Sequence, residues 1–172
     1  MAHELYTRTN QKLFFAGLSL ESWRKAEEGR AMNAQAMVQS EREAALFHLY
    51  GALLGLCHEI AGYYRLPEAN APRVELLLTA DVLAVAPSPE LAELVELAQQ
   101  GETWLAELLA AYRALFQPPQ VPKQAKVDPG LPLITAVNVG EEIAPLSRET
   151  LESWRQNLKS LALRFRETLS EC

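Results

Sequence analysis

Residues 44–64 read AALFHLYGALLGLCHEIAGYY, and this stretch decides the fold. His48, His58 and Glu59 interrupt a run that otherwise consists of apolar, small or tyrosine side chains. A run of this length can span a membrane, but a glutamate and a histidine near one end would be costly there. A helix that is apolar nearly all round belongs at the centre of a protein. The stretch therefore predicts a buried core helix, covered by neighbouring helices or by a second subunit, and no membrane span.

The spacing of apolar residues and the capping signals predict the bounds of the core helix and of two further long helices. Residues 34–65 are expected to form the core helix, with Asn33 as its N-cap and an end before Pro67. Apolar residues at steps of three and four predict a second helix over residues 5–28. A further helix is expected from the N-cap Ser147 to near the end of the chain.

The middle of the chain carries weaker signals. Ser88 followed by Pro89 and Glu90 is typical of an N-cap and a first helical turn. Residues 102–117 show a helical face that includes Trp104. Residues 73–86 fit either a helix or a strand, and the helix is favoured. We expect two or three shorter helices in this part.

Residues 118–145 interrupt the helical pattern with six prolines and two glycines. A connection of this length is unusual in a compact domain. Because the length and composition of the chain fit one globular domain, the sequence nevertheless predicts a single domain over residues 1–172. Its fold class is all-α, an antiparallel four- or five-helix bundle with a Pro-rich excursion at 118–145 before the C-terminal helix.

Composition excludes several classes of protein. The 172 residues are 49% apolar and 22% charged, as in one globular domain, and the net charge is −6. Residues 67–117 hold eight Asp or Glu and only two Lys or Arg. No basic stripe suited to phosphates is present, so nucleic-acid binding is disfavoured. Cys57 and Cys172 form no disulfide framework and the N-terminus lacks a secretory pattern, so we expect a cytoplasmic protein.

Motifs for common catalytic chemistry are missing from the sequence. It contains no Gly-rich phosphate loop, no nucleophile elbow around a serine, and no zinc or carboxylate-bridged metal motif. His48 and His58 lie ten residues apart, about 80° around a regular helix, and do not converge on one ion. We therefore expect no metal and no cofactor.

Arg42 and His48 are the candidate catalytic residues. They enclose five residues, and this spacing resembles the Arg-x(4 to 6)-His motif of HEPN-type ribonucleases, which are all-α proteins of similar size. The resemblance implies a catalytic pair of Arg42 and His48 at a dimer cleft. On a regular helix the two side chains point about 120° apart.

His58, Glu59 and Tyr63 are the candidate ligand-binding residues. They lie at the end of the core helix, and together with Tyr64 and tryptophans of other helices they could line a pocket between helices. The alternative is that these aromatic side chains belong to the core. A ligand-binding bundle predicts a sizeable closed cavity near His58, Tyr63 and a tryptophan.

Two segments carry a resemblance over most of the chain: MAHELYTRTNQKLFFAG at residues 1–17 and EREAALFHLYGALLGLCHEIAGYYRLP at 41–67. Both resemble a small bacterial family of uncharacterised proteins, a domain of unknown function. The resemblance implies a bacterial, cytoplasmic, stand-alone domain and transfers no activity to any residue. The preferred hypothesis is a non-enzymatic protein-interaction or oligomerisation domain, either a homodimer through an apolar surface or bound to an unidentified protein.

Overall fold

The structure of the protein, a computed structural model, describes residues 2–118 and 145–170. Every regular element in these ranges is helical, which confirms the predicted all-α class. The elements are α1 (Ala2–Glu28), α2 (Ala34–Tyr63), the 3-10 helix η1 (Val74–Leu76), α3 (Ala80–Val85), α4 (Pro89–Gln99), α5 (Trp104–Ala114) and α6 (Arg148–Ser170). The predicted excursion at 118–145 lies, except for its two end residues, outside the described residues.

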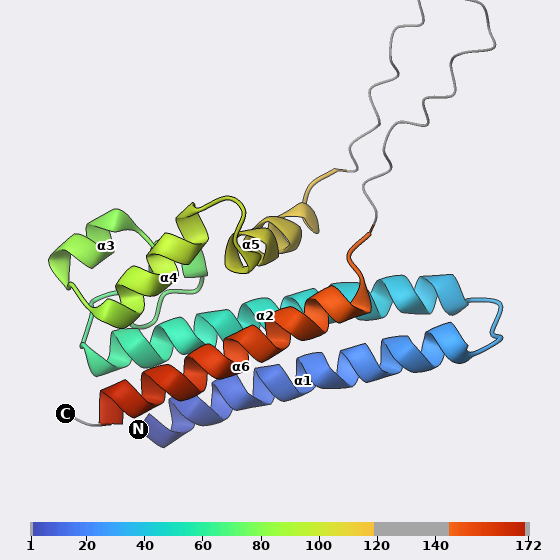
Figure 1. The fold of residues 1–172 in the computed structure, drawn as a ribbon, viewed down its shortest axis with the longest axis horizontal. Coiled ribbons are helices and arrows are strands. Elements are labelled where there is room, and N and C mark those ends of the chain that lie inside the picture. The colour runs from blue at the N-terminus through green and yellow to red at the C-terminus, as the bar shows by residue number, and fades with distance from the viewer. Residues whose placement is uncertain (1, 119–144, 171–172) are drawn as a thin grey trace, which may run out of the picture.

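The three long helices α1, α2 and α6 lie side by side, and α3, α4 and α5 form a second group against α2 (Figure 1). Arg42, near the start of α2, donates from Nε to the carbonyl oxygen of Leu146, just before α6, at 3.1 Å. Near the ends of both helices, Arg166 pairs with Glu59 at 2.7 Å. The helices α2 and α6 therefore run in the same direction, and α1 runs opposite to both (Figure 1). The predicted antiparallel arrangement is thus wrong for α2 and α6, because the long segment between α5 and α6 returns the chain to the end at which α2 begins.

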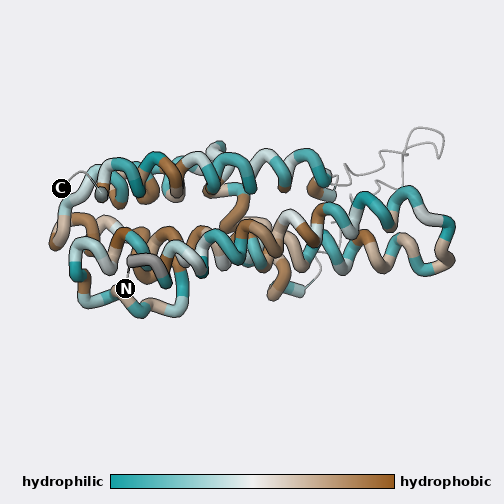
Figure 2. The backbone as a smooth tube through the Cα atoms, turned by 90° about the horizontal axis from the view of Figure 1, so that it is seen from below, coloured by the Kyte–Doolittle hydropathy of each residue, from teal (hydrophilic) through white to brown (hydrophobic). Residues whose placement is uncertain are grey.

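Helix α2 is the central element, because it contacts α1, α4, α5, α6 and η1. Leu49, Leu53, Leu56 and Ile60 are at most 1% exposed. The predicted stripes of the two other long helices are buried too: Leu13, Ala16, Leu20 and Trp23 in α1, and Leu151, Trp154, Leu158, Leu161, Phe165 and Leu169 in α6. In Figure 2 the end of the α1–α2 hairpin, at the right, is mostly hydrophilic. The core thus follows α2 from about its first third onward.

By length and composition, α2 is the one helix in the described ranges that could cross a membrane. Of the most apolar 18-residue stretch of this helix, 67% is buried inside the protein. The apolar surface of α2 is therefore largely used for packing against neighbouring helices.

Capping side chains fix most of the helix starts. Ser88 Oγ accepts from the Leu91 amide at 3.2 Å at the start of α4, and Ser147 Oγ accepts from the Thr150 amide at 3.1 Å at the start of α6, both as predicted. Asn33 occupies the N-cap position of α2, but its side chain makes no capping hydrogen bond. The expected side-chain cap at Asn33 is therefore wrong, because the α1–α2 connection places it at φ −99° and ψ 18°, outside the extended geometry of a capping residue.

Two predicted helices differ in extent from those observed. Residues 73–86 form helical elements and not a strand, as favoured, but η1 and α3 divide the segment, because Thr79 is extended and caps a new helix through the Val82 amide at 3.1 Å. Helix α2 stops at Tyr63 and not at residue 65. Arg65 adopts a left-handed φ of 53°, and the next amide, Leu66, donates back to the Ala61 carbonyl at 2.9 Å. This Schellman geometry ends the helix before Pro67 can act on it.

Candidate functional site

A cavity of about 340 Å³ opens between the N-terminal end of α1, the C-terminal end of α2 and the segment after α2. We call it the α1–α2 cavity. It is lined by Glu4, Leu5, Tyr6, His58, Glu59, Gly62, Tyr63, Ala69 and Asn70. Gly62 helps to keep this space open, because a Cβ there would stand only 3.2 Å from Leu5 Cδ1. The volume lies in the range of small-molecule sites.

A buried ion pair forms one wall of the cavity. Glu59 is 4% exposed, and its Oε1 accepts from Arg166 Nε at 2.7 Å. Its Oε2 accepts from Thr9 Oγ1 at 2.7 Å and from Arg166 Nη2 at 3.2 Å. Arg166 also donates to Asn10 Oδ1 at 3.0 Å and lies 4.5 Å from the ring centroid of Tyr6. Both carboxylate oxygens of Glu59 are therefore occupied, so this residue is a fixed part of the wall that joins α1, α2 and α6.

The remaining polar groups of the cavity are few. His58 is half-buried, and its Nε2 lies 2.7 Å from the carbonyl oxygen of Ala71. A carbonyl only accepts, so Nε2 carries the proton and Nδ1 is the acceptor of the neutral ring. Tyr63 is 42% exposed, with its ring 5.0 Å from that of Tyr64 in an edge-on arrangement. Asn70 adds an exposed amide. The site therefore combines aromatic and aliphatic surface with a small number of hydrogen-bonding groups.

The structure brings the three candidate ligand-binding residues, His58, Glu59 and Tyr63, into the lining of this one cavity. No tryptophan lines it, although a tryptophan was expected. Sequence reasoning missed Tyr6 and Asn70. The apolar stripe of the first helix includes Tyr6, but no pattern in the sequence shows that the segment after Pro67 folds back against it.

Arg42, one member of the candidate catalytic pair, is held by structural contacts. Its guanidinium carbon lies 4.8 Å from the ring centroid of Trp23, and it donates to the carbonyl oxygen of Leu146 and to the side chain of Gln39. These contacts hold the start of α2 against α1 and against Leu146, which precedes α6.

His48, the other member, lies elsewhere. Its ring packs edge-on against Phe15 and Phe47, with both centroids 5.4 Å away, and its buried Nδ1 has no hydrogen-bond partner in the described part of the chain. Burial, followed by the charge of Lys12, lowers the pKa of His48. The structure therefore does not assemble Arg42 and His48 into one site.

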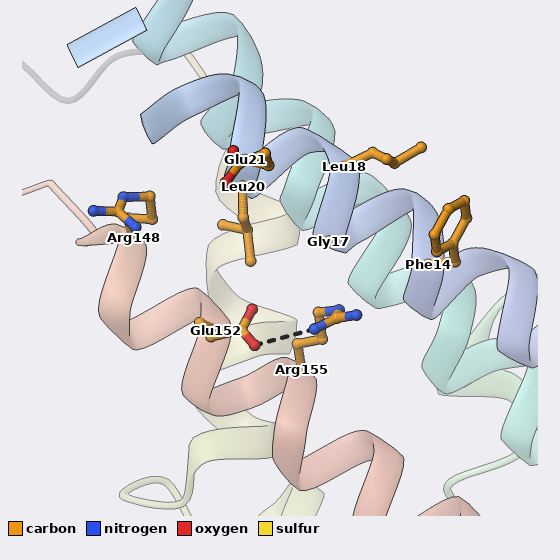
Figure 3. A pocket seen from close by; sticks show the side chains of 8 residues that line it. All are labelled: Phe14, Gly17, Leu18, Leu20, Glu21, Arg148, Glu152 and Arg155. Carbon is orange, nitrogen blue, oxygen red and sulfur yellow. Dashed lines mark hydrogen bonds and ion pairs between the residues drawn. The ribbon is translucent and has the colours of Figure 1, made fainter. Parts of the chain in front are cut away.

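A second concave region lies between α1 and α6. Two hollows of about 360 and 300 Å³ share Phe14 and Arg155, and we call them together the α1–α6 groove. Arg155 crosses it and donates to the Leu13 carbonyl at 2.8 Å. Arg155 also pairs with Glu152 at 3.0 Å (Figure 3). Phe14 and Leu18 lie on its α1 side and are 60% and 50% exposed.

A family model described as "Family of unknown function (DUF6586)" matches residues 1–172. The chain belongs to this family. Neither the curated proteins nor the solved structures include a match to the DUF6586 chain. The family therefore extends over both the α1–α2 cavity and the α1–α6 groove, and it assigns no activity to either.

The residues of this DUF6586 chain that the structure describes contain no group of three or more His, Cys, Asp or Glu side chains able to hold a metal ion. Cys57 is buried in α2, and burial raises the pKa of its thiol to about 12. Its environment is that of a packed core residue, not of a reactive thiolate.

Proposed function

We propose that this DUF6586 chain binds a small, largely apolar aromatic molecule in the α1–α2 cavity and performs no chemistry on it. The observation that carries the proposal is the cavity itself, in which two tyrosine rings, Tyr6 and Tyr63, meet aliphatic surface from Leu5 and Ala69. Pockets for small molecules are typically apolar, with a few polar groups that set orientation. His58 and Asn70 would supply those groups.

The arrangement of charge supports binding without catalysis. A general acid or base needs a titratable group within reach of the substrate and free to exchange a proton. The carboxylate of Glu59 accepts from Arg166 and Thr9 and is not free in this sense. Nε2 of His58 is engaged by a backbone carbonyl. These groups suit recognition better than proton transfer.

The test is a fluorescence titration of the full chain with N-phenyl-1-naphthylamine, a neutral aromatic probe. We expect saturable binding with one site per chain. Ala69→Phe, which would fill the cavity, is expected to abolish it, and Tyr63→Ala is expected to weaken it by about tenfold, because one ring contact contributes roughly 1 kcal/mol or more.

The matched control is Phe14→Ala, which removes an exposed aromatic residue from the α1–α6 groove. It should leave probe binding unchanged. Thermal melting by circular dichroism would show that each variant is folded. Binding that survives Ala69→Phe and is lost in Phe14→Ala would overturn the proposal.

A second candidate function is self-association through the α1–α6 groove, and a specific observation favours it. Phe14, Leu18 and Leu163 are each at least half exposed, and the groove runs between the helices that carry them. The hollow beside Arg148 and Arg155 is also lined by two carboxylates, Glu21 and Glu152 (Figure 3). Mixed charge of this kind can pair with itself across a two-fold axis, so the proposed occupant is a second copy of the chain.

Sedimentation equilibrium tests the second candidate. We expect a dimer for the unaltered chain and a monomer for Leu18→Glu combined with Leu163→Glu. A monomer at high concentration for the unaltered chain would contradict self-association. A partner of another sequence would then be the occupant to seek.

We also infer that the helices form one bundle around α2, with α1 and α6 as its long members and α4 and α5 as its short ones. The contacts of α2 with all four helices support this arrangement. The tyrosine hydroxyl of Tyr64 adds a polar link, because it donates to the buried carboxylate of Glu90 at 2.9 Å.

A further inference from the structure

A smaller cavity of about 180 Å³ adjoins the α1–α2 cavity, and His58 lines both. We call it the Arg8–Lys12 cavity. Its lining is Arg8, Lys12, Phe47, Tyr50, Gly51, Leu54, Gly55, His58, Pro72 and Tyr112. On α1, Arg8 follows Glu4 by one helical turn and Lys12 follows Arg8 by another. The two cavities therefore lie in succession along the same side of the α1–α2 pair.

Two cations in this cavity lack a carboxylate partner. Arg24, Arg164 and Arg166 each form an ion pair at 2.7 Å or less. Among the described residues, Arg8 and Lys12 form none within 4.0 Å. Arg8 and Lys12 therefore place two positive charges, one helical turn apart, at the same cavity without a carboxylate of the described residues to neutralise them.

Packing holds Lys12 at the cavity. Its ammonium lies 5.3 Å from the ring centroid of Phe47 and 6.0 Å from that of Phe15. Its methylene groups lie against Gly51, where a Cβ would be 3.2 Å from Lys12 Cδ. The charged end is therefore kept near aromatic faces, and the methylene groups lie against the α2 backbone.

The other walls are aromatic and apolar. Tyr50 and Tyr112 stack with their centroids 3.8 Å apart and an interplanar angle of 10°. The Tyr50 hydroxyl donates to Oε2 of Glu75 at 2.7 Å, so this carboxylate is already engaged by a wall residue. A negatively charged group entering here would meet two cations in a partly apolar surrounding, where a charge-assisted hydrogen bond is stronger than in water.

We propose that Arg8 and Lys12 bind the anionic group of the ligand whose aromatic part occupies the α1–α2 cavity. The inference rests on the proposed function and narrows its ligand class to small aromatic molecules that carry one carboxylate, sulfonate or phosphate. His58, which lines both cavities, would lie beside the junction of the aromatic and anionic parts.

The test compares two fluorescent probes on the full chain. The probe 8-anilinonaphthalene-1-sulfonate is aromatic and anionic, whereas N-phenyl-1-naphthylamine is aromatic and neutral. In the double variant Arg8→Gln and Lys12→Gln, the Kd for the sulfonate probe should rise by at least about tenfold, the effect of losing a hydrogen bond to a charged group. The Kd for the neutral probe should stay within about twofold.

Two controls separate this effect from general charge and from loss of the cavity. Lys159→Gln combined with Arg164→Gln removes two cations of α6 outside this cavity and should change neither Kd. Tyr63→Ala should raise both. Binding of the sulfonate probe to the unaltered chain should also weaken as salt is raised, because exposed charges are screened.

The outcomes are distinct. Equal changes for the two probes in the Arg8→Gln and Lys12→Gln variant, or no change for either, would overturn the assignment of an anion subsite and leave the proposed function standing. Absence of binding of the neutral probe to the unaltered chain would overturn the proposed function itself.

Discussion

At the scale of single residues, Glu59 shows how one buried charge organises this protein. The carboxylate accepts from a hydroxyl of α1 and a guanidinium of α6, so three helices depend on it. Its side chain is 1% exposed and that of Arg166 is 15% exposed. Removal of one member of such a pair leaves the other charge buried without compensation.

We predict that Glu59→Ala lowers the free energy of unfolding by about 3–5 kcal/mol. The double variant Glu59→Leu and Arg166→Met should recover most of this loss, because apolar side chains of similar volume replace both charges. Arg164→Ala serves as the control, since its ion pair with Glu93 is exposed and should contribute under about 1 kcal/mol. Urea unfolding would measure all four proteins, and similar losses for Glu59→Ala and Arg164→Ala would contradict the prediction.

His48 gives a prediction on pH. Its pKa is lowered in the folded protein by burial and by Lys12, so at mildly acidic pH the unfolded chain binds a proton that the folded chain does not. The stability that depends on neutral His48 is therefore complete above the ordinary pKa of about 6.5 and is lost as the pH falls below it. Unfolding free energies measured between pH 7.5 and 5.5 should fall less steeply in His48→Phe than in the unaltered chain. Equal slopes of unfolding free energy against pH in the two proteins would contradict the prediction, because they would mean that His48 binds protons alike in the folded and the unfolded chain.

At the scale of elements, the glycines of α2 determine how closely α1 can approach. A Cβ at Gly55 would stand 2.6 Å from Thr9 Oγ1 and 3.3 Å from Thr9 Cα. The Thr9 hydroxyl is itself bonded to Glu59, so it cannot move without losing that contact. The glycine therefore permits a close helix crossing that places the ion pair and the α1–α2 cavity.

We predict that Gly55→Ala destabilises the protein by about 1–3 kcal/mol through overpacking. This is opposite to the gain of about 1 kcal/mol that the substitution gives in a free helix. Gly101→Ala is the matched control, because no atom lies within 4 Å of the position of its Cβ, and its effect should stay within about 0.5 kcal/mol. Thermal unfolding would measure the change in stability of both variants. A Gly55→Ala protein more stable than the unaltered chain would refute the close crossing of α1 and α2.

The C-terminus of α2 carries a different backbone constraint. Arg65 adopts φ 53°, a left-handed conformation that costs roughly 1–2 kcal/mol in a residue with a Cβ. Arg65→Gly should relieve part of this cost and raise the free energy of unfolding by up to about 1 kcal/mol, while Arg65→Ala should not. Equal stabilities of the two variants in urea would argue against strain at this position.

At the scale of the whole molecule, stability and charge are unevenly distributed. Helix α2 is enclosed by four helices, whereas α3 has no buried residue. The acidic surplus of residues 67–117 lies in the layer from η1 to α5, and the layer of α1, α2 and α6 carries both the cavity and the groove. The proposed ligand surface therefore lies mainly on the less acidic layer of the protein.

This distribution predicts an order of hydrogen exchange. Amides of α3 (Ala80–Val85) should exchange through local opening, while amides around Leu53 and Leu56 should exchange only with global unfolding. Hydrogen–deuterium exchange with mass spectrometry would measure both regions. Equal protection in α3 and in the middle of α2 would contradict a hierarchy based on burial.

The sequence by itself determined the helical class, the central place of α2, the buried stripes of α1 and α6 and the caps at Ser88 and Ser147. Each of these is a local or periodic property of neighbouring residues, and such properties are readable along the chain. It also singled out His58, Glu59 and Tyr63, because polar and aromatic groups at the end of an apolar helix are conspicuous.

Only the tertiary structure decided which of these residues meet and what each one faces. Arg166 lies 107 positions from Glu59, and Asn70 lines the same cavity as Tyr6 although 64 positions separate them, so no spacing rule connects the members of either pair. The contacts of the Arg42 and His48 side chains were likewise decided by packing: Arg42 lies against Trp23 and bonds to the Leu146 carbonyl. His48 packs against Phe15 and Phe47. Contacts between distant segments depend on how helices pack, and packing depends on the shape of every side chain at once.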